Sequence, residues 1–364
     1  EPTTPANTAD DRGDQVDSIA VKLDGDVKNA NQEAQKINDY KNAHPNTVSG
    51  EEAQHFADQG LSIDDEPDSE INQITVDHNN KDKGNTLSKG QSETIDGIHI
   101  THTDKMTHKE QYVMKINSDN KVIVDFQHNQ CSGKEITVTY DDLKNSYYLE
   151  NIDNKTNRIK ILKIERTFSD IRPGNTIFTS NGSTPTSDGL YDECHGPQLI
   201  IYNDPSDGFF YNNIKQVSVK DIYYDDKGKE IKFKDGDKNE AWIFVTSLNS
   251  DGHKRWDNKT YIEKVKAEIK AENSDPTPAD IEKLDGSTVT GHHDGWWYSD
   301  EDNGSYNGGS YKDLAWDNNS EDNRYAFVGA VAIKYQPGLT ITYGSDDNAW
   351  DSHGYVRKHN LFQL

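Results

Sequence analysis

Cysteine is nearly absent from this 364-residue chain, which holds only Cys131 and Cys194. Two cysteines permit at most one bridge, and one disulfide or two free thiols are both compatible with the sequence. Neither residue has a CxxC partner or the ligand spacing of a zinc site. This spacing argues against a thiolate metal centre.

Apolar residues are also scarce, because they make up only 31% of the chain. No apolar run reaches the about eighteen residues that a membrane-spanning helix needs. We see no signal peptide or C-terminal anchor, and we expect any such segment to lie outside this sequence. The length suffices for one large sandwich domain or two ordinary domains, and part of the chain is expected to have no core of its own.

Basic residues are much fewer than acidic residues, 39 against 64, and the formal net charge is −25. The richest basic window, residues 155–166, alternates with Ile and Leu and therefore predicts a strand rather than a basic patch. Such a surface repels phosphate backbones and anionic membranes. We therefore do not expect nucleic-acid or membrane binding.

Catalytic signatures are missing: the sequence contains no GxSxG, HExxH, GxxxxGK[ST] or GxGxxG. Carboxylates are so abundant that some pair will lie at glycosidase separation by accident. Nothing in the sequence singles out one carboxyl as a general acid. We therefore expect a protein that is not an enzyme.

The N-terminal part predicts helix. From Val16 to Tyr40 the apolar residues are spaced by three and four, which indicates a helix with one thin stripe, typical of a stalk. The stripe consists of Ile19, Leu23, Val27, Ala30, Ala34 and Ile37. A short helix over 50–59 follows. We divide the chain into a polar N-terminus and stalk at 1–60, an acidic linker at 61–94 and a β domain at 95–364.

The β domain is predicted from repeated period-2 alternation of apolar and polar residues. About a dozen strands without βαβ alternation favour an antiparallel sandwich. Asp226 to Lys229 predicts a hairpin turn, and Thr277 to Leu284, with Pro278 at its first turn, predicts a short accessory helix. The predicted strands cover 97–103, 111–116, 121–127, 135–140, 158–168, 198–202, 216–224, 231–233, 241–248, 325–335 and 339–343.

The stretch 291–325 carries aromatic rings among glycine, asparagine and carboxylates, and no apolar run in it could form a core element. Rings on an irregular surface segment suit a polyhydroxylated ligand, because they cover the C–H faces of a sugar while polar side chains take its hydroxyls. The alternative for each ring is packing into the end of a sheet. Trp296 and Trp297 are adjacent, so on an extended backbone one faces inward and the other outward. The candidate carbohydrate-binding residues are Trp296, Trp297, Tyr298, Tyr306, Tyr311, Trp316, Asp317 and Trp350.

A metal site is a second possibility in this stretch. Asp300 to Gly304 fails as an EF-hand loop, because the glycine comes one position early and no closing Glu follows. A looser calcium site remains open, since hard cations prefer oxygen ligands. Its candidate ligands are Asp300, Asp302 and Asp317, and the alternative is a solvated acidic face.

Several stretches, taken in order, resemble a known family. They are EITVTYDDLKNSYY (135–148), YNDPSDGFFYNNIKQVSVKDIYYDDKGKEI (202–231), WIFVTSLNS (242–250), LDGSTVTGH (284–292) and AWDNNSEDNRYAFVGAVA (315–332). This order resembles the glucan-binding protein C domain over roughly residues 95–350. The same domain is the variable region of streptococcal antigen I/II adhesins and the polymer-binding domain of enterococcal aggregation substance.

The resemblance implies a lectin-like β-supersandwich with a stalk helix, on the cell wall of a Gram-positive bacterium. It also implies a cleft at one end, often with a bound cation. We therefore expect a monomeric, non-catalytic adhesin that binds α-glucan or host glycans. The alternatives are an adhesin that binds a host or bacterial glycoprotein, and an aggregation domain that holds extracellular DNA or another polymer. The stretches 266–283 and 294–313 look longer than in the family, and this leaves the ligand open.

Overall fold

We describe the chain from a computed structural model, which divides it into two compact units, Glu1–Thr47 and Val48–Leu364. The described residues are 20, 22–23, 27–28, 60–77, 84–85, 88, 90–95, 98–103, 121–126, 131, 133–152, 155–173, 197–212, 214–233, 240–251, 261–271, 273–299, 303, 326–345 and 352–354. In the N-terminal unit, the five described residues are helical and exposed. Two of them, Leu23 and Val27, belong to the predicted stripe. The rest of that helix and the helix expected at 50–59 lie outside the described residues.

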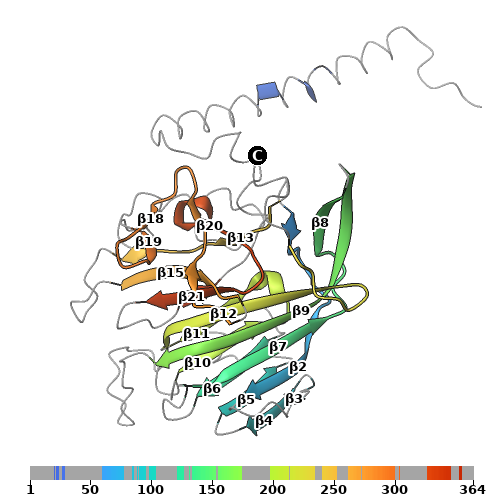
Figure 1. Cartoon of the computed structure of the whole chain (residues 1–364), viewed down its shortest axis with the longest axis vertical. Helices are drawn as coiled ribbons and strands as arrows, with labels where there is room; N and C mark the ends of the chain where they lie inside the picture. The colour runs from blue at the N-terminus through green and yellow to red at the C-terminus, as the bar shows by residue number, and fades with distance from the viewer. Residues whose placement is uncertain are drawn as a thin grey trace, which may run out of the picture. The chain divides into compact units, whose positions relative to one another are not determined.

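One large antiparallel sheet dominates the second unit (Figure 1). Its strands run in the order β18 (Val289–Gly291), β19 (Trp297–Ser299), β15 (Tyr261–Ile269), β21 (Leu339–Ser345), β12 (Ile214–Asp225), β9 (Lys155–Pro173), β7 (Glu135–Asp141), β2 (Glu70–Asp77) and β3 (Gly84–Asn85). Four short strands attach beside this path: β1 (Leu61–Ser62) on β8 (Tyr147–Ile152), β8 on β9, and β14 (Ser250–Asp251) and β16 (Thr277–Pro278) on β15.

Two smaller antiparallel sheets complete the unit. The second sheet runs β22 (Ser352–Gly354), β11 (Phe209–Asn212), β10 (Gln198–Tyr202), β6 (Lys121–Phe126), β5 (Ile98–Thr103) and β4 (Gln91–Ile95). The third runs β13 (Trp242–Val245), β20 (Val331–Lys334) and β17 (Ile281–Lys283). Two 3-10 turns, η2 (Pro205–Asp207) and η4 (Ala326–Gly329), precede β11 and β20. Within the described residues, no helix is long and apolar enough to cross a membrane.

A single large core joins the inner faces of the three sheets. Side chains of the main sheet such as Val219 and Phe168 pack with Phe209 of the second sheet and Ile243 of the third. The second sheet is also buried on its other face, where a small cluster gathers Ile123, Ile200, Tyr202 and Phe210. Continuous apolar runs such as LIIY in β10 are typical of strands buried on both faces, whereas β9 and β12 alternate.

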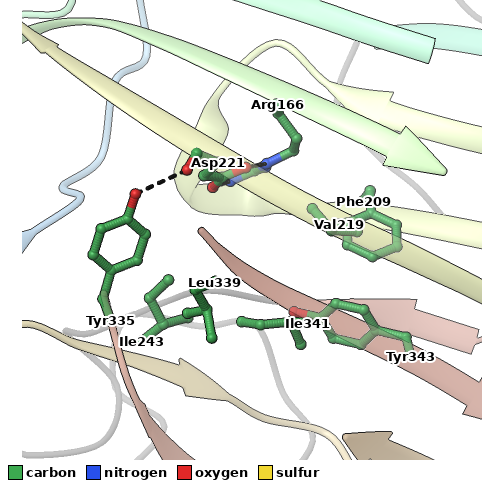
Figure 2. Close-up of a pocket in the computed structure, with 9 residues that line it drawn as sticks. All are labelled: Arg166, Phe209, Val219, Asp221, Ile243, Tyr335, Leu339, Ile341 and Tyr343. Atoms are coloured by element: carbon green, nitrogen blue, oxygen red, sulfur yellow. Dashed lines mark hydrogen bonds and ion pairs between the residues drawn. The ribbon is translucent and has the colours of Figure 1, made fainter. Parts of the chain in front are cut away.

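An ion pair lies inside this core (Figure 2). Arg166 donates from Nε and Nη2 to the two carboxylate oxygens of Asp221 at 2.9 and 2.8 Å, and from Nη1 to the carbonyl of Pro205 at 3.2 Å. The hydroxyl of Tyr335 donates to the backbone carbonyl of Asp221 at 2.9 Å. A cavity of about 20 Å³ adjoins the pair, which is room for about one water molecule. The buried charges are therefore paired rather than isolated.

The structure confirms the antiparallel β class and most of the predicted strands, among them those at 121–127, 135–140, 158–168, 198–202, 216–224 and 339–343. The turn at 226–229 is confirmed as well, since Asp225 donates to the carbonyl of Lys229 at 2.9 Å. Residues 231–233 form no strand, and of 325–335 only β20 is a strand after the turn η4. The prediction at 111–116 lies outside the described residues.

Two predictions are wrong. The interval 61–94 is not a linker, because it contains β1 to β4, and β2 pairs with β7 inside the main sheet. A bulge between Ile71 and Gln73 breaks the alternation of β2, which hides the strand from a period-2 reading. The helix expected at 277–284 is also absent. Pro278 lies in the edge strand β16, where a missing N–H is tolerated, and β17 pairs with β20.

The turn between β20 and β21 offers a test of the backbone. Gly338 has φ +91°, and a Cβ placed there would collide with the carbonyl oxygen of Lys270. Gly228 has φ +73° in open space. We expect Gly228→Ala to lower the free energy of unfolding by about 1–2 kcal/mol, the cost of left-handed backbone alone. Gly338→Ala should cost more, because it adds the collision. Urea unfolding of both variants measures this, and equal losses would contradict the close approach.

Candidate functional site

The hairpin of β18 and β19 carries the first aromatic residues of the stretch predicted to bind sugar. A tight turn closes it: the N–H of His292 donates to the carbonyl of Trp296 at 2.8 Å, and the N–H of Gly295 to the carbonyl of His292 at 3.0 Å. Gly295 has φ +80°, and the carboxylate of Asp294 accepts from the N–H of Trp296 at 3.1 Å. The sequence HHDGWW therefore forms a turn that presents two tryptophans at the start of a strand.

Trp297 faces the core. It pairs with Val265 on one side and Gly291 on the other, and its half-buried ring packs against the main core cluster. A Cβ on Gly291 would lie 2.9 Å from Cε2 of this ring. Gly291 therefore leaves the space that the indole occupies. This contact gives Trp297 a packing role at the edge of the core.

Trp296 faces the opposite side of the sheet, as the alternation of the strand predicts. The far edge of its half-buried ring lies over Gly344 of β21, where a Cβ would be 2.9 Å from Cη2. The Nζ atoms of Lys264 and Lys266 are 4.9 and 5.2 Å from the ring centroid. These are cation–π distances.

Tyr298 lies on the same face as Trp296. It pairs with Lys264, and its ring stacks on His292 with a centroid distance of 3.5 Å and an interplanar angle of 2°. We call the set Trp296, Tyr298, His292, Lys264 and Lys266 the Trp296 platform. It combines flat rings with two ammonium groups on the outer face of the main sheet.

Polar side chains also lie on this face of the sheet beside the platform, and two of them, Ser218 and Thr342, are buried. Ser218 of β12 and Thr342 of β21 are paired residues whose hydroxyls are 2.9 Å apart. Gln216 is paired with Gly344 and donates to Asp170. Hydroxyl and amide groups therefore lie within one or two strands of the indole.

Outside the described residues lie the candidate sugar contacts Tyr306, Tyr311, Trp316, Asp317 and Trp350 and the candidate metal ligands Asp300, Asp302 and Asp317. Their roles stay predictions. Of the eight predicted contacts, the structure brings Trp296 and Tyr298 together on one face and Trp297 onto the other.

A buried group of oxygens lies on the inner face below the platform. Glu263 of β15 is buried and pairs with Ser345 of β21, which is fully buried. Ser299 follows Tyr298 on the other side of β15 and is also fully buried. Carboxylate and hydroxyl groups thus occupy three neighbouring strands at one end of the core.

Asn303 lies next to these residues and is fully buried. Its N–H donates to Oδ1 of Asn249 at 2.9 Å, and its Nδ2 donates to the carbonyl of Leu248 at 3.3 Å and to Oγ of Ser299 at 3.4 Å. The N–H of Asn249 in turn donates to Glu263 at 3.1 Å. Within the described structure, Oδ1 of Asn303 and Oγ of Ser345 are buried without a hydrogen-bond partner. We call Glu263, Ser299, Asn303 and Ser345 the oxygen pocket.

Sequence reasoning missed the oxygen pocket, although one signal was present. In YIEKVKAEI, Glu263 shares its face with Val265 and Ala267, so a period-2 reading places a carboxylate inside the core. A buried carboxylate needs hydrogen bonds or a cation. The signal was hidden because the strand β15 itself was not predicted.

A second group of acidic residues accepts hydrogen bonds from backbone N–H groups. Carboxylate oxygens of Asp65, Asp204 and Asp207 lie within 4.8 Å of one another. Asp204 caps η2 by accepting from the N–H of Ser206 at 2.8 Å, and it accepts from the N–H of Glu66 at 2.8 Å. Burial raises the pKa of the Asp204 carboxyl. These contacts assign Asp204 to holding the turn and the start of the β domain together.

Glu66 fixes the loop between β7 and β8. Its buried carboxylate accepts from the N–H groups of Lys144, Asn145 and Ser146 at 2.7–2.8 Å and from the hydroxyl of Ser146 at 2.9 Å. The thiol of Cys131 is buried, and burial raises its pKa to about 11. A thiol with that pKa is protonated at neutral pH and unreactive.

Comparison with known proteins supports the resemblance. The family model of glucan-binding protein C matches residues 40–356. No curated protein matches the sequence. Glucan-binding protein C of Streptococcus mutans is 18% identical over 85% of this chain and 81% of its own, with a TM-score of 0.50. Two structures of the PrgB adhesin domain of Enterococcus faecalis, one bound to DNA, are 18% and 17% identical over 72% of this chain and 77% and 72% of their own, with TM-scores of 0.47 and 0.48. The chain therefore belongs to the glucan-binding protein C family of adhesins.

Proposed function

We propose that this chain is a non-catalytic adhesin domain, displayed on the bacterial cell wall, that binds α-glucan or a host glycan through the Trp296 platform. The observation that carries the proposal is the outward indole of Trp296, which lies over Gly344 with the Nζ atoms of Lys264 and Lys266 at 4.9 and 5.2 Å from its centroid. The family supports it, and glucan-binding protein C of Streptococcus mutans is described as mediating sucrose-independent and sucrose-dependent adherence.

The chemistry of the platform suits a sugar. The indole face covers the C–H groups of a pyranose ring, and polar groups beside it, such as the amide of Gln216 on β12, can accept from or donate to its hydroxyls. Contacts of this kind are individually weak, so one domain binds modestly. Many copies on a cell surface raise the avidity.

The test is binding of the purified chain to immobilised dextran and to a broad glycan panel. We expect saturable binding to at least one polysaccharide. Absence of binding to every polysaccharide of the panel would contradict the proposal. Binding to a glycoprotein that survives its enzymatic deglycosylation would instead favour the protein-binding alternative.

The family resemblance implies a bound cation, and we also propose that the oxygen pocket holds one. The residues fit calcium, which prefers oxygen ligands. Two of the pocket's oxygens, Oδ1 of Asn303 and Oγ of Ser345, are buried without partners in the described structure. Glu263 is paired with Ser345, and its carboxylate accepts from the N–H of Asn249. A calcium ion would neutralise the carboxylate and satisfy both orphan oxygens. The bound ion is expected to link Asn303 to strands β15 and β21.

Calcium is expected to raise the melting temperature by about 5 °C at a hundredfold excess over its dissociation constant. Glu263→Gln should abolish this calcium-dependent rise, because it removes the only charge of the pocket. Asp207→Asn, a matched change in the other acidic group, should keep the rise. Thermal unfolding in calcium and in EDTA measures both. A rise lost in Asp207→Asn but kept in Glu263→Gln would contradict the oxygen pocket.

A further inference from the structure

We propose, resting on the proposed function, that Lys264 and Lys266 cap the indole of Trp296, and that a saccharide must displace their ammonium groups before it stacks on the ring. The inference concerns the regulation of the platform rather than the identity of its ligand. On β15, Lys264 and Lys266 alternate with the buried residues Val265 and Ala267. Both lysine side chains therefore lie on the outer face of the sheet, with their Cα atoms about 7 Å apart.

The indole of Trp296 lies on the sheet beside these lysines. Its Cη2 atom is 2.9 Å from the position that a Cβ on Gly344 would take, and Cε of Lys264 is 3.4 Å from the same position. Gly344 is the cross-strand partner of Lys264. The Nζ atoms of Lys264 and Lys266 lie over the ring, 4.9 and 5.2 Å from its centroid. The indole is half-buried, and these neighbours cover part of it.

The two ammonium groups occupy space that a stacked sugar needs. The C–H groups of a pyranose contact an aromatic ring when their carbon atoms lie about 3.5–4.0 Å from its atoms. The Nζ atoms, at 4.9 and 5.2 Å from the centroid, lie within the thickness of a sugar placed at that distance. A saccharide and an ammonium group therefore cannot share the same part of the ring face. Stacking of the sugar breaks the cation–π contacts.

The cap is weak enough to open. A cation–π contact at an exposed site changes an equilibrium constant by about twofold to fivefold. Glu268 lies two residues beyond Lys266 on the same face of β15 and is exposed, so it offers the displaced ammonium group a counter-charge. The turn that carries the ring is held separately, because Asp294 accepts from the N–H of Trp296 at 3.1 Å. The lysine side chains can therefore leave the ring while the backbone at Trp296 stays in place.

The test measures the affinity for dextran, a neutral polymer that ammonium groups do not attract by charge. We expect Lys266→Thr to bind dextran about threefold more tightly than the wild type, and Lys264→Thr/Lys266→Thr about tenfold more tightly. Threonine suits a strand but has neither the ammonium group nor the long chain of lysine.

Lys220→Thr is the matched control. Lys220 alternates with the buried residues Val219 and Asp221 of β12, so it also lies half-buried on the outer face of the main sheet. It is four residues along the strand from Gln216, the partner of Gly344. This variant changes the net charge as Lys266→Thr does, and its affinity for dextran should equal that of the wild type.

Two further measurements tie the gain to the ring. In a Trp296→Ala background, Lys266→Thr should give no gain, because no indole is left to uncover. A readout without sugar is the quenching of Trp296 fluorescence by acrylamide, taken as the difference between each protein and its Trp296→Phe counterpart. This quenching should increase in Lys264→Thr/Lys266→Thr and stay unchanged in Lys220→Thr.

The outcomes separate this inference from the proposed function. Dextran affinity that is unchanged or lower in Lys264→Thr/Lys266→Thr overturns the inference alone, because the ammonium groups would then be neutral toward the sugar or would bind it. An equal gain in Lys220→Thr, or a gain that persists in the Trp296→Ala background, overturns it as well. Unchanged acrylamide quenching in the double variant overturns it whatever the sugar results. Absence of binding to every polysaccharide, in the wild type and the variants alike, rejects the proposed function, whereas the quenching still tests the cap.

Discussion

Replacing Trp296 by alanine should lower the affinity for the bound polysaccharide by about tenfold or more while leaving the melting temperature almost unchanged. Central aromatic anchors commonly contribute about 2 kcal/mol or more to binding. The ring lies on the outer face of the sheet, over Gly344. Its removal therefore exposes little of the core. Titration of each variant with the polysaccharide, beside a thermal melt, measures both quantities.

The neighbouring residue provides the matched control. Trp297 packs against the main core, so Trp297→Ala should lower the free energy of unfolding by about 3 kcal/mol. The folded fraction of that variant should still bind. Gly344→Ala adds a second check, because its Cβ would displace the indole of Trp296 without removing it. Unchanged binding in Trp296→Ala, or a Trp297→Ala protein as stable as the wild type, would reverse the assignment of the two rings.

The second large effect is expected at the buried ion pair. Asp221→Ala should lower the free energy of unfolding by about 3–5 kcal/mol, because it leaves the guanidinium of Arg166 buried without its counter-charge. Burial alone would lower the pKa of Arg166, but the adjacent carboxylate of Asp221 outweighs it and the pKa is raised. Arg166 therefore stays charged, and it cannot escape the cost by losing its proton. Urea unfolding followed by tryptophan fluorescence gives the free energy.

Two comparisons make this result interpretable. Arg166→Met/Asp221→Leu removes both charges and should recover much of the loss, since apolar replacements of buried pairs are often neutral. Asp68→Ala breaks the exposed pair with Lys144 and should cost less than about 1 kcal/mol. If Asp221→Ala proves as mild as Asp68→Ala, water from the adjacent cavity must be reaching the guanidinium.

The sequence predicted those parts of the fold where the strand period is unbroken. Strands β9 and β12 alternate over most of their length, and the stretches at 158–168 and 216–224 were found from that pattern alone. Strand β2 was missed because of its bulge. In β15 the lysines, glutamate and alanine are good helix formers. Only its pairing with β21 and β19 makes it a strand.

The candidate site was predicted in part for the same reason. Alternation places Trp296 and Trp297 on opposite faces, but it cannot tell which face is the core. Gly291 and Gly344 decide this, and they lie on other strands. The lysines beside Trp296 and the oxygen pocket likewise arise from pairing between segments far apart in the sequence. No local pattern contains that information.

Strand β15 carries Val265 and Ala267 on one face and Lys264 and Lys266 on the other. A slip of one residue would drive both lysines into the hydrocarbon interior, so the hydrogen-bonding register of this strand is locked. In the proposed binding site, differently shaped glycans must then be accommodated by rotamer changes of the indole and of the two lysine side chains. The backbone of β15 beneath these side chains keeps its register, so the side chains alone set the specificity.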